Sequence, residues 1–180
     1  ESKSAVDQPH NQKFLGFSFS KTGIRKIVFA PASLKKLKAK IREMTIPRSG
    51  ISFSDRTRSL SRYMTGWIGY YALAENPIVF RSIDQWMRRH LRLCQWMEWR
   101  LTRTKVRELK NLGLSERQAY VLVGIGKNSG HWRTAHTRLL GWAMSPAYFK
   151  KLGVPCLRDL YESVRQSWRT AVYGPVCTVV

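Results

Sequence analysis

Few residues of this 180-residue chain have the types and spacing that catalysis requires. Acid–base and two-metal chemistry both need at least two carboxylates close together. The four aspartates, Asp7, Asp55, Asp84 and Asp159, form no DD or DxD pair. The seven glutamates are scattered among basic residues, where helix-surface ion pairs explain them more simply. Unless folding brings distant acids together, we therefore expect no catalytic residues in this chain.

Metal, nucleophile and phosphate-loop motifs are also missing from the sequence. His131 and His136 are five residues apart, which is not the HExxH spacing of a zinc site, and no CxxC pair occurs. Neither a GxSxG nucleophile elbow nor a GxxxxGK[ST] loop is found. We expect Cys94, Cys156 and Cys177 to be reduced thiols, with Cys94 a small core residue. No metal or other cofactor is predicted within this chain.

The chain is strongly basic. Lys and Arg number 32 against 11 Asp and Glu, which gives a formal net charge of +21. A surface this positive repels itself unless a polyanion compensates it, so nucleic acid is the leading partner and an anionic membrane surface the second candidate. Apolar residues make up 43% of the chain, which is enough to bury a core in one domain or two small ones.

One segment, Trp86–Arg100, interleaves basic and aromatic residues. At about 100° per residue, a helix would separate its side chains into two faces, one that packs and one that meets phosphates. An alternative is a solvated cationic face with tryptophans at its rim, but this alternative explains the net charge poorly. The packing face carries Trp86, Cys94 and Met97, and the other face carries Arg88, Arg92 and Trp99.

The candidate nucleic-acid-binding residues lie on this segment, on a lysine-rich segment before it and near Trp132. Phosphate contacts carry little sequence information, which suits recognition of folded RNA by its shape. Trp99 and Trp132 are available for stacking on unpaired bases. The full set is Lys35, Lys36, Lys38, Lys40, Arg42, Arg88, Arg89, Arg92, Trp99, Arg100, Arg103, Trp132 and Arg133.

A mainly α fold with an N-terminal β-hairpin must position these side chains. Alternating aromatic and small residues predict a hairpin formed by Lys13–Phe19 and Ile27–Phe29, with its turn at Lys21–Gly23. Apolar residues three and four apart predict three main helices over 34–44, 54–71 and 80–110, with Gly113 ending the third. Shorter helices over 115–120, 146–152 and 156–168 predict a small helical C-terminal extension, and we expect residues 173–180 to fray.

Two glycines, Gly66 and Gly69, flank Trp67 in the second predicted helix. Each glycine costs roughly 1 kcal/mol relative to alanine in a helix interior. We interpret the pair as a place where helices pack closely, with contact to a ligand backbone as the alternative.

Membrane segments are not expected. Residues 1–12 are polar, and no apolar run approaches the roughly 18 residues that a spanning helix needs. The lysine-rich helix 34–44 has no Trp or Phe to seat in a membrane surface. We therefore expect a cytoplasmic protein without a membrane partner.

Several motifs in fixed order resemble the C-terminal part of group II intron reverse transcriptases. Ser2–Val6 and the FLGF sequence of Phe14–Phe17 resemble the end of the polymerase palm. The GW-x-x-YY pattern of Gly66–Tyr71 and the sequence Ile83–Arg92 resemble the maturase-specific, or X, domain, although His90 stands where the family usually has an arginine. Residues 114–180 are similar to the C-terminal extension of bacterial members, more loosely.

This resemblance implies a domain order and a role. Residues 1–30 would be the end of the palm, 31–113 the thumb or maturase-specific domain, a three-helix bundle, and 114–180 a small helical extension that binds DNA or RNA. The implied partners are group II intron RNA and an RNA template with its DNA primer, with target DNA a further candidate. Phe14, Leu15, Gly16 and Phe17 would lie near the primer end.

The resemblance also implies where the chemistry takes place. The parent protein would be an RNA-directed DNA polymerase of the bacterial cytosol, associated with the nucleoid. Its Mg²⁺ ions would be held by a palm aspartate motif that this chain lacks. The alternative is a free-standing basic RNA-binding or RNA-chaperone module with no polymerase.

Overall fold

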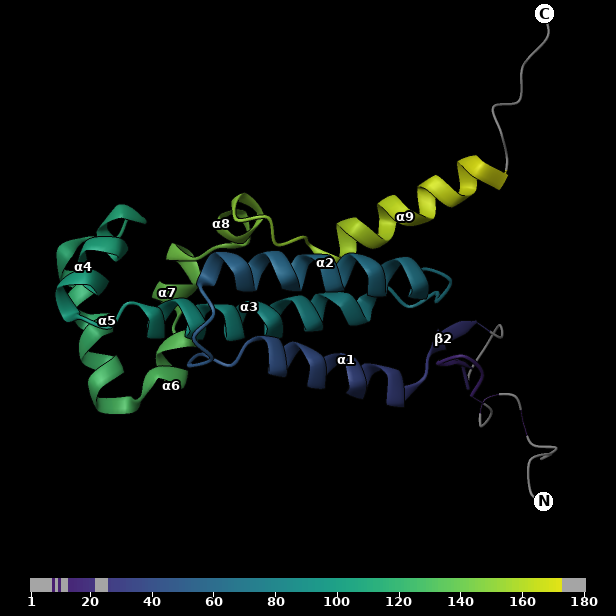
Figure 1. The fold of residues 1–180 in the computed structure, drawn as a ribbon, viewed down its shortest axis with the longest axis horizontal. Coiled ribbons are helices and arrows are strands. Elements are labelled where there is room, and N and C mark those ends of the chain that lie inside the picture. The colour runs from purple at the N-terminus through teal and green to yellow at the C-terminus, as the bar shows by residue number, and fades with distance from the viewer. Residues whose placement is uncertain (1–7, 9, 11–12, 22–25, 173–180) are drawn as a thin grey trace, which may run out of the picture.

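The fold is mainly helical, with a short hairpin at its N-terminal side (Figure 1). It was obtained as a computed structural model, which describes residues 8, 10, 13–21 and 26–172. Ser2–Val6, the turn residues Thr22 and Gly23, Cys177 and the 173–180 segment lie outside the described residues. Within the described part, the elements are β1 (Phe17–Phe19), β2 (Ile27–Phe29), α1 (Pro31–Met44), α2 (Phe53–Tyr71), α3 (Ile78–Glu98), α4 (Thr102–Asn111), α5 (Glu116–Ser129), α6 (His131–Ala135), α7 (Arg138–Ala143), α8 (Pro146–Lys151) and α9 (Leu157–Val172).

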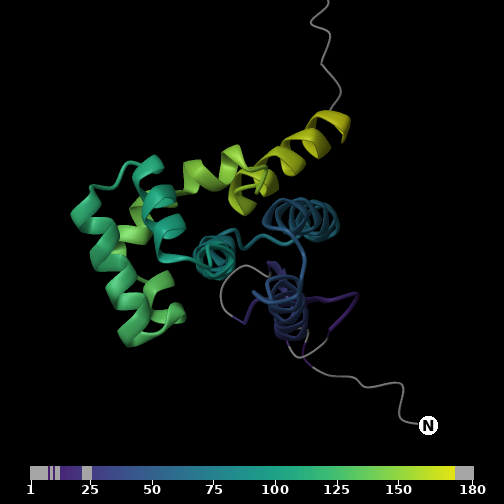
Figure 2. The ribbon, with the colours of Figure 1, turned by 60° about the vertical axis from the view of Figure 1, so that its left-hand side comes forward.

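The three longest N-terminal helices, α1, α2 and α3, form the bundle that the apolar spacing predicts. Figure 2 looks nearly along their axes and shows them grouped around a common centre. Each contributes a stripe of residues three and four apart, which is the pattern of a helix packed on one face. The centre is filled by fully buried side chains, among them Leu37, Ile41, Leu60, Met64, Ile68, Phe80, Met87 and Leu91.

The hairpin pairs β1 with β2 in antiparallel register, with Phe17 opposite Phe29. It docks where α1 begins and α2 ends, because the hydroxyl of Ser33 donates to the carbonyl of Gly16 at 2.9 Å and the hydroxyl of Tyr70 donates to the carbonyl of Leu15 at 3.1 Å. Gly16 has φ +85°, and a Cβ there would collide with the Tyr71 hydroxyl, so this position requires glycine. The predicted hairpin is confirmed.

The predicted helix over 80–110 is wrong in one respect, because it is two helices. α3 ends at Glu98, and α4 begins at Thr102 with a different direction. Trp99 leaves the helical conformation at ψ 80° while its side chain stays buried, so the break lets a large ring remain inside as the chain turns. α4 then packs against α5.

The C-terminal helices attach to the bundle through α3. α6 packs along the C-terminal half of α3, and α9 packs across α2 and α3. The buried Asp84 carboxylate accepts the backbone N–H of Leu157 at 3.2 Å, which satisfies a donor at the start of α9. The short helices α6 and α7 were not anticipated from the sequence. No helix among residues 26–172 is long and apolar enough to cross a bilayer.

Candidate nucleic-acid interface

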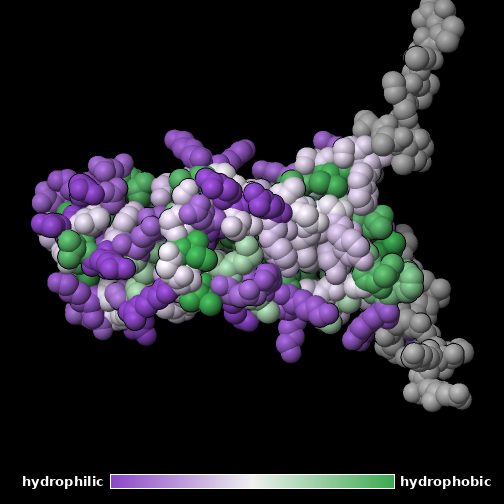
Figure 3. Space-filling view, in the orientation of Figure 1, coloured by the Kyte–Doolittle hydropathy of each residue, from purple (hydrophilic) through white to green (hydrophobic). Residues whose placement is uncertain are grey.

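Lysines on α1 form a row that faces solvent. Leu37 and Ile41 are one turn apart and fully buried in the bundle, so positions 35, 36 and 38 must point away from it. Lys35, Lys36 and Lys38 are exposed, and none forms an ion pair with a described acidic residue. In Figure 3 strongly hydrophilic side chains project along the lower edge, where α1 lies in Figure 1. This row carries positive charge without an internal counter-ion.

The last two basic residues predicted on α1 have partners within the protein. The ammonium of Lys40 lies 2.7 Å from the carboxylate of Glu43, one turn further along the helix. The guanidinium of Arg42 lies 5.3 Å from the centre of the Trp86 ring, in a cation–π contact that leaves its outer N–H groups open to solvent. Both side chains remain within reach of a phosphate, but Lys40 would have to leave the Glu43 carboxylate to bind it.

Three arginines predicted on α3 have different environments. Arg89 is exposed, as expected. The Arg88 guanidinium lies 3.9 Å from the Asp84 carboxylate, and the Nε of Arg92 donates to the carbonyl of Met144 at 3.2 Å. Burial is the main cause that lowers the pKa of Arg92, followed by the nearby Arg88 and Arg89. Arg92 therefore helps attach the C-terminal helices to α3, whereas Arg88 pairs with an acid of its own helix.

The prediction that Trp99 stacks on unpaired bases is wrong for this conformation. Its side chain is only 9% exposed, because the chain turns at Trp99 and folds the ring inward. Trp132, by contrast, is 43% exposed. The remaining predicted cations, Arg100, Arg103 and Arg133, are all exposed.

Rings from α3 and α6 form a column of alternating tryptophan and histidine, here called the Trp–His column. Its members Trp86, His90, Trp132 and His136 have successive ring centres 4.4, 5.0 and 4.6 Å apart. Burial is the main cause that lowers the pKa of His90 and of His136, and neighbouring arginines lower both further. The imidazoles are therefore neutral near pH 7, and the rings meet edge to face or tilted, with Trp132 between His90 and His136.

The FLGF segment places two apolar side chains in solvent. Phe14 is 74% and Leu15 65% exposed, whereas Phe17 packs on the Tyr71 ring at 5.2 Å between centres. Gly16 holds the tight turn between them. Of the four residues predicted near a primer end, Phe14 and Leu15 thus form an exposed tip, whereas Phe17 is partly buried against the core.

A shallow groove of about 560 Å³ lies between α1 and α2, beside the hairpin. Lys36 and Arg62 stand at its sides, and Trp67 and Tyr70 contribute rings. No atom lies within 4 Å of the Cβ position at Gly66, which also lines this groove, or at Gly69. The expectation that these glycines serve close helix packing is therefore wrong, and they leave bare helix backbone facing open space.

A deeper cavity of about 650 Å³ lies where the bundle meets the C-terminal helices. Its walls include three cations that our sequence reasoning did not select, namely Arg48, Arg56 and Lys105. One signal was available: Arg56 lies one turn before Leu60 on the apolar stripe of α2, so a buried charge could have been predicted there. Arg48 and Lys105 carry no such signal, because only the tertiary fold brings them together.

Comparison with known proteins assigns the central part of the chain. The family model that describes the group II intron, maturase-specific domain matches residues 34–113, which run from α1 to the end of α4. The match confirms the resemblance noted in the sequence. No match was found among curated proteins.

Proposed function

We propose that this chain is a maturase region that takes part in splicing and grips group II intron RNA through the exposed cations around its bundle, because residues 34–113 match the group II intron, maturase-specific domain. The grip is electrostatic and follows the shape of the folded RNA. In this proposal the chain contributes binding and positioning, and the chemistry takes place elsewhere.

The observation that carries this proposal is the row of α1 lysines without internal counter-ions. An exposed lysine that already pairs with an acid gains little from a phosphate, whereas Lys35, Lys36 and Lys38 have no such competition from described residues. Each phosphate contact releases condensed counter-ions from the RNA, which favours binding at low salt. Arg89, Arg100, Arg103 and Arg133 are exposed and extend the same surface.

The groove between α1 and α2 supports a second part of the proposal, which is contact with a template–primer duplex. Gly66 has no side chain there, so a sugar–phosphate backbone can approach the helix closely. Lys36 and Arg62 would bind its phosphates, and the exposed FLGF tip at Phe14 and Leu15 would lie near the primer end. Target DNA would follow the same basic surface.

Mg²⁺-dependent polymerisation is proposed for the parent protein, with its residues outside this chain. Among the described residues, no three His, Cys, Asp or Glu side chains come together as metal ligands, so no step is assigned to a metal here. The proposed place of action is the cytoplasm of a bacterium, where intron transcripts are made and spliced.

A charge-removal experiment tests the proposed grip. The variant with Lys35, Lys36 and Lys38 all changed to Gln should bind folded group II intron RNA more weakly than the original chain. Its plot of log affinity against log salt should become shallower by up to about 2.7, at about 0.9 per lost contact. Filter binding over a series of KCl concentrations measures both quantities.

The matched control changes the same three lysines to arginine, which keeps the charge and should keep the salt dependence. Melting curves of both variants should match that of the original chain, since all three side chains are exposed. An unchanged salt slope in the glutamine variant, with a normal melting curve, would show that α1 does not contact the RNA.

A further inference from the structure

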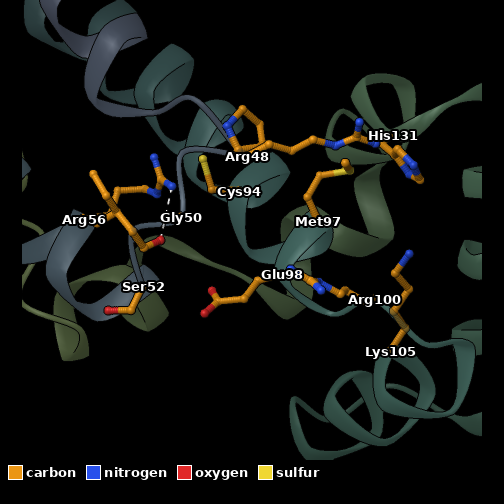
Figure 4. A pocket seen from close by; sticks show the side chains of 12 residues that line it. Arg48, Gly50, Ser52, Arg56, Cys94, Met97, Glu98, Arg100, Lys105 and His131 are labelled. Carbon is orange, nitrogen blue, oxygen red and sulfur yellow. Dashed lines mark hydrogen bonds between the residues drawn. The ribbon is translucent and has the colours of Figure 1, made fainter.

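The cavity at the junction of the bundle and the C-terminal helices is lined by several separate segments, among them α2 with Arg56 (Figure 4). The loop between α1 and α2 supplies Arg48, the end of α3 supplies Met97, α4 supplies Lys105 and α6 supplies His131. Its volume of about 650 Å³ lies within the range of about 300–1,000 Å³ that small-molecule sites span. A ligand here would touch the bundle and the extension at once.

The charge of the cavity is strongly one-sided. Arg48, Arg56, Arg100 and Lys105 line it, against a single carboxylate, Glu98. Figure 4 shows Arg48 running along one edge toward His131, with Arg100 and Lys105 near each other on another side. Because like charges this close repel one another, an anion in the cavity lowers the electrostatic energy of its walls.

Arg56 is the most informative of these cations, because it is only 4% exposed. Its guanidinium donates to the carbonyl of Met44 at 2.8 Å and to the hydroxyl of Ser49 at 3.0 Å, which are neutral acceptors. No described acid pairs with it, and Glu98 instead accepts the backbone N–H of Phe53 at 3.4 Å. Neutral acceptors satisfy its hydrogen bonds but not its charge, so Arg56 adds to the positive potential of the cavity.

Neighbouring groups respond to the same excess of positive charge. The pKa of His131 is lowered by burial first and then by Lys105 and Arg48. Its Nδ1 accepts the indole N–H of Trp96 at 3.2 Å, and the Lys105 ammonium lies 4.6 Å from the centre of that Trp96 ring. These contacts hold the cationic wall in place without neutralising it.

Apolar side chains also line the cavity. Pro47, Ile51 and Met97 line it together with Cys94, whose thiol donates to the carbonyl of Thr45 at 3.2 Å. Burial raises the pKa of the Cys94 thiol to about 11, so it stays protonated and uncharged. A cavity lined by both cations and apolar side chains suits a ligand that has an anionic group joined to a planar ring.

We propose that this cavity receives one unpaired nucleotide of the bound RNA, with its phosphate toward Arg48, Arg100 and Lys105 and its base against Ile51 and Met97. The inference rests on the proposed function, because the nucleotide belongs to the RNA that the basic surface binds. The bound nucleotide bridges the loop after α1 and the end of α3 to α4 and α6. The maturase domain and the extension would thereby be held together by RNA.

A pair of RNA hairpins tests this inference. One hairpin is fully paired, and the other is identical except for a single bulged adenosine. The original chain should bind the bulged hairpin roughly tenfold more tightly, as expected for charge-assisted contacts made by one nucleotide. The variant with Arg48 and Arg100 both changed to Gln should lose this preference, because it lacks two of the cations proposed to bind the phosphate. Both side chains are exposed, so their removal leaves the core intact.

The matched control is Arg117→Gln, which removes an exposed arginine of α5 that does not line the cavity. It should retain the preference. Equal binding of the two hairpins by the original chain, or a preference that survives in the cavity variant, overturns the inference and leaves the proposed function standing. Failure to bind either hairpin or folded intron RNA overturns both. If an acidic peptide binds in the cavity while the bulge has no effect, the partner is a protein and the inference is wrong.

Discussion

Arg89 and Arg92 are three positions apart on α3, yet one faces solvent and the other donates to the carbonyl of Met144. The helical repeat alone could not predict which of the two arginines is exposed, because the C-terminal helices cover one side of the cationic face of α3. A carbonyl at the end of α7 has no helical partner, and Arg92 satisfies it. A basic side chain can therefore hold the fold together instead of binding RNA.

Replacing Arg92 with alanine should lower the free energy of unfolding by about 1–2 kcal/mol, because a half-buried carbonyl loses a charged donor. Arg89→Ala removes the same charge from an exposed position and should change that free energy by less than about 0.5 kcal/mol. Urea unfolding of both variants measures the difference. Equal losses would mean that Arg92 is not a structural residue.

Protonation of the Trp–His column should destabilise the protein. The pKa values of His90 and His136 in the folded chain lie below the ordinary value of 6.5. As the pH falls through 6.5, the unfolded chain takes up these protons before the folded chain does, so folding becomes less favourable. Stability should be fully present above pH 6.5, decline below it, and level off once the folded histidines are also protonated.

Melting temperatures measured on either side of pH 6.5 check this prediction. His90→Gln should flatten the decline, because it removes one of the histidines whose pKa lies below the ordinary value. A melting temperature that stays constant or rises as the solution is acidified would contradict the prediction.

At the scale of the elements, Gly126 on α5 lies tightly against Trp96 of α3. A Cβ there would lie 2.9 Å from the Cζ2 atom of Trp96, a fully buried ring whose indole N–H donates to His131. The ring has little freedom to move, so Gly126→Ala should lower the free energy of unfolding by about 1–3 kcal/mol through overpacking.

Gly69→Ala is the matched comparison, since no atom lies within 4 Å of its Cβ position on α2. This change should stabilise the helix by up to about 1 kcal/mol, because alanine has the higher helix propensity. Thermal unfolding of both variants decides between them. Destabilisation by Gly69→Ala would place α2 against a neighbour that the structure does not show.

The sequence predicted those elements whose pattern is local. The lysines at 35, 36 and 38 alternate with the buried Leu37 and Ile41 in one helix, so their exposure followed from the helical repeat alone. The break at Trp99 did not, because the residues around it continue an apolar and basic helical pattern. The reason for that break is tertiary, namely the burial of Trp99 and the packing of α4 on α5.

The candidate site, like the helices, was predictable only where the pattern is local to one helix. Exposed cations were found where periodicity alone decides which side of a helix faces solvent. The carbonyl that Arg92 contacts and the cavity around Arg56 depend on residues far apart in sequence, such as Arg92 with Met144 and Arg48 with Lys105. Contacts of this kind cannot be inferred from spacing along one helix.

At the scale of the whole molecule, the hairpin and the helices α4–α7 lie at opposite ends of an elongated bundle (Figure 1). The hairpin end exposes apolar side chains such as Phe14 and Ile78, and the opposite end carries the cationic cavity. The α1 lysines lie between them. A folded RNA that follows this side of the molecule can contact both ends at once.

The affinity of the chain for folded group II intron RNA tests the central claim most directly. It should be compared, over a series of salt concentrations, with that for an RNA of equal length and composition that lacks the intron fold. The account predicts tighter binding of the intron RNA, with log affinity falling against log salt at a slope of about −4.5 or steeper, equivalent to about five phosphate contacts or more. Equal affinity for the two RNAs, or no binding of intron RNA at low salt, would contradict it.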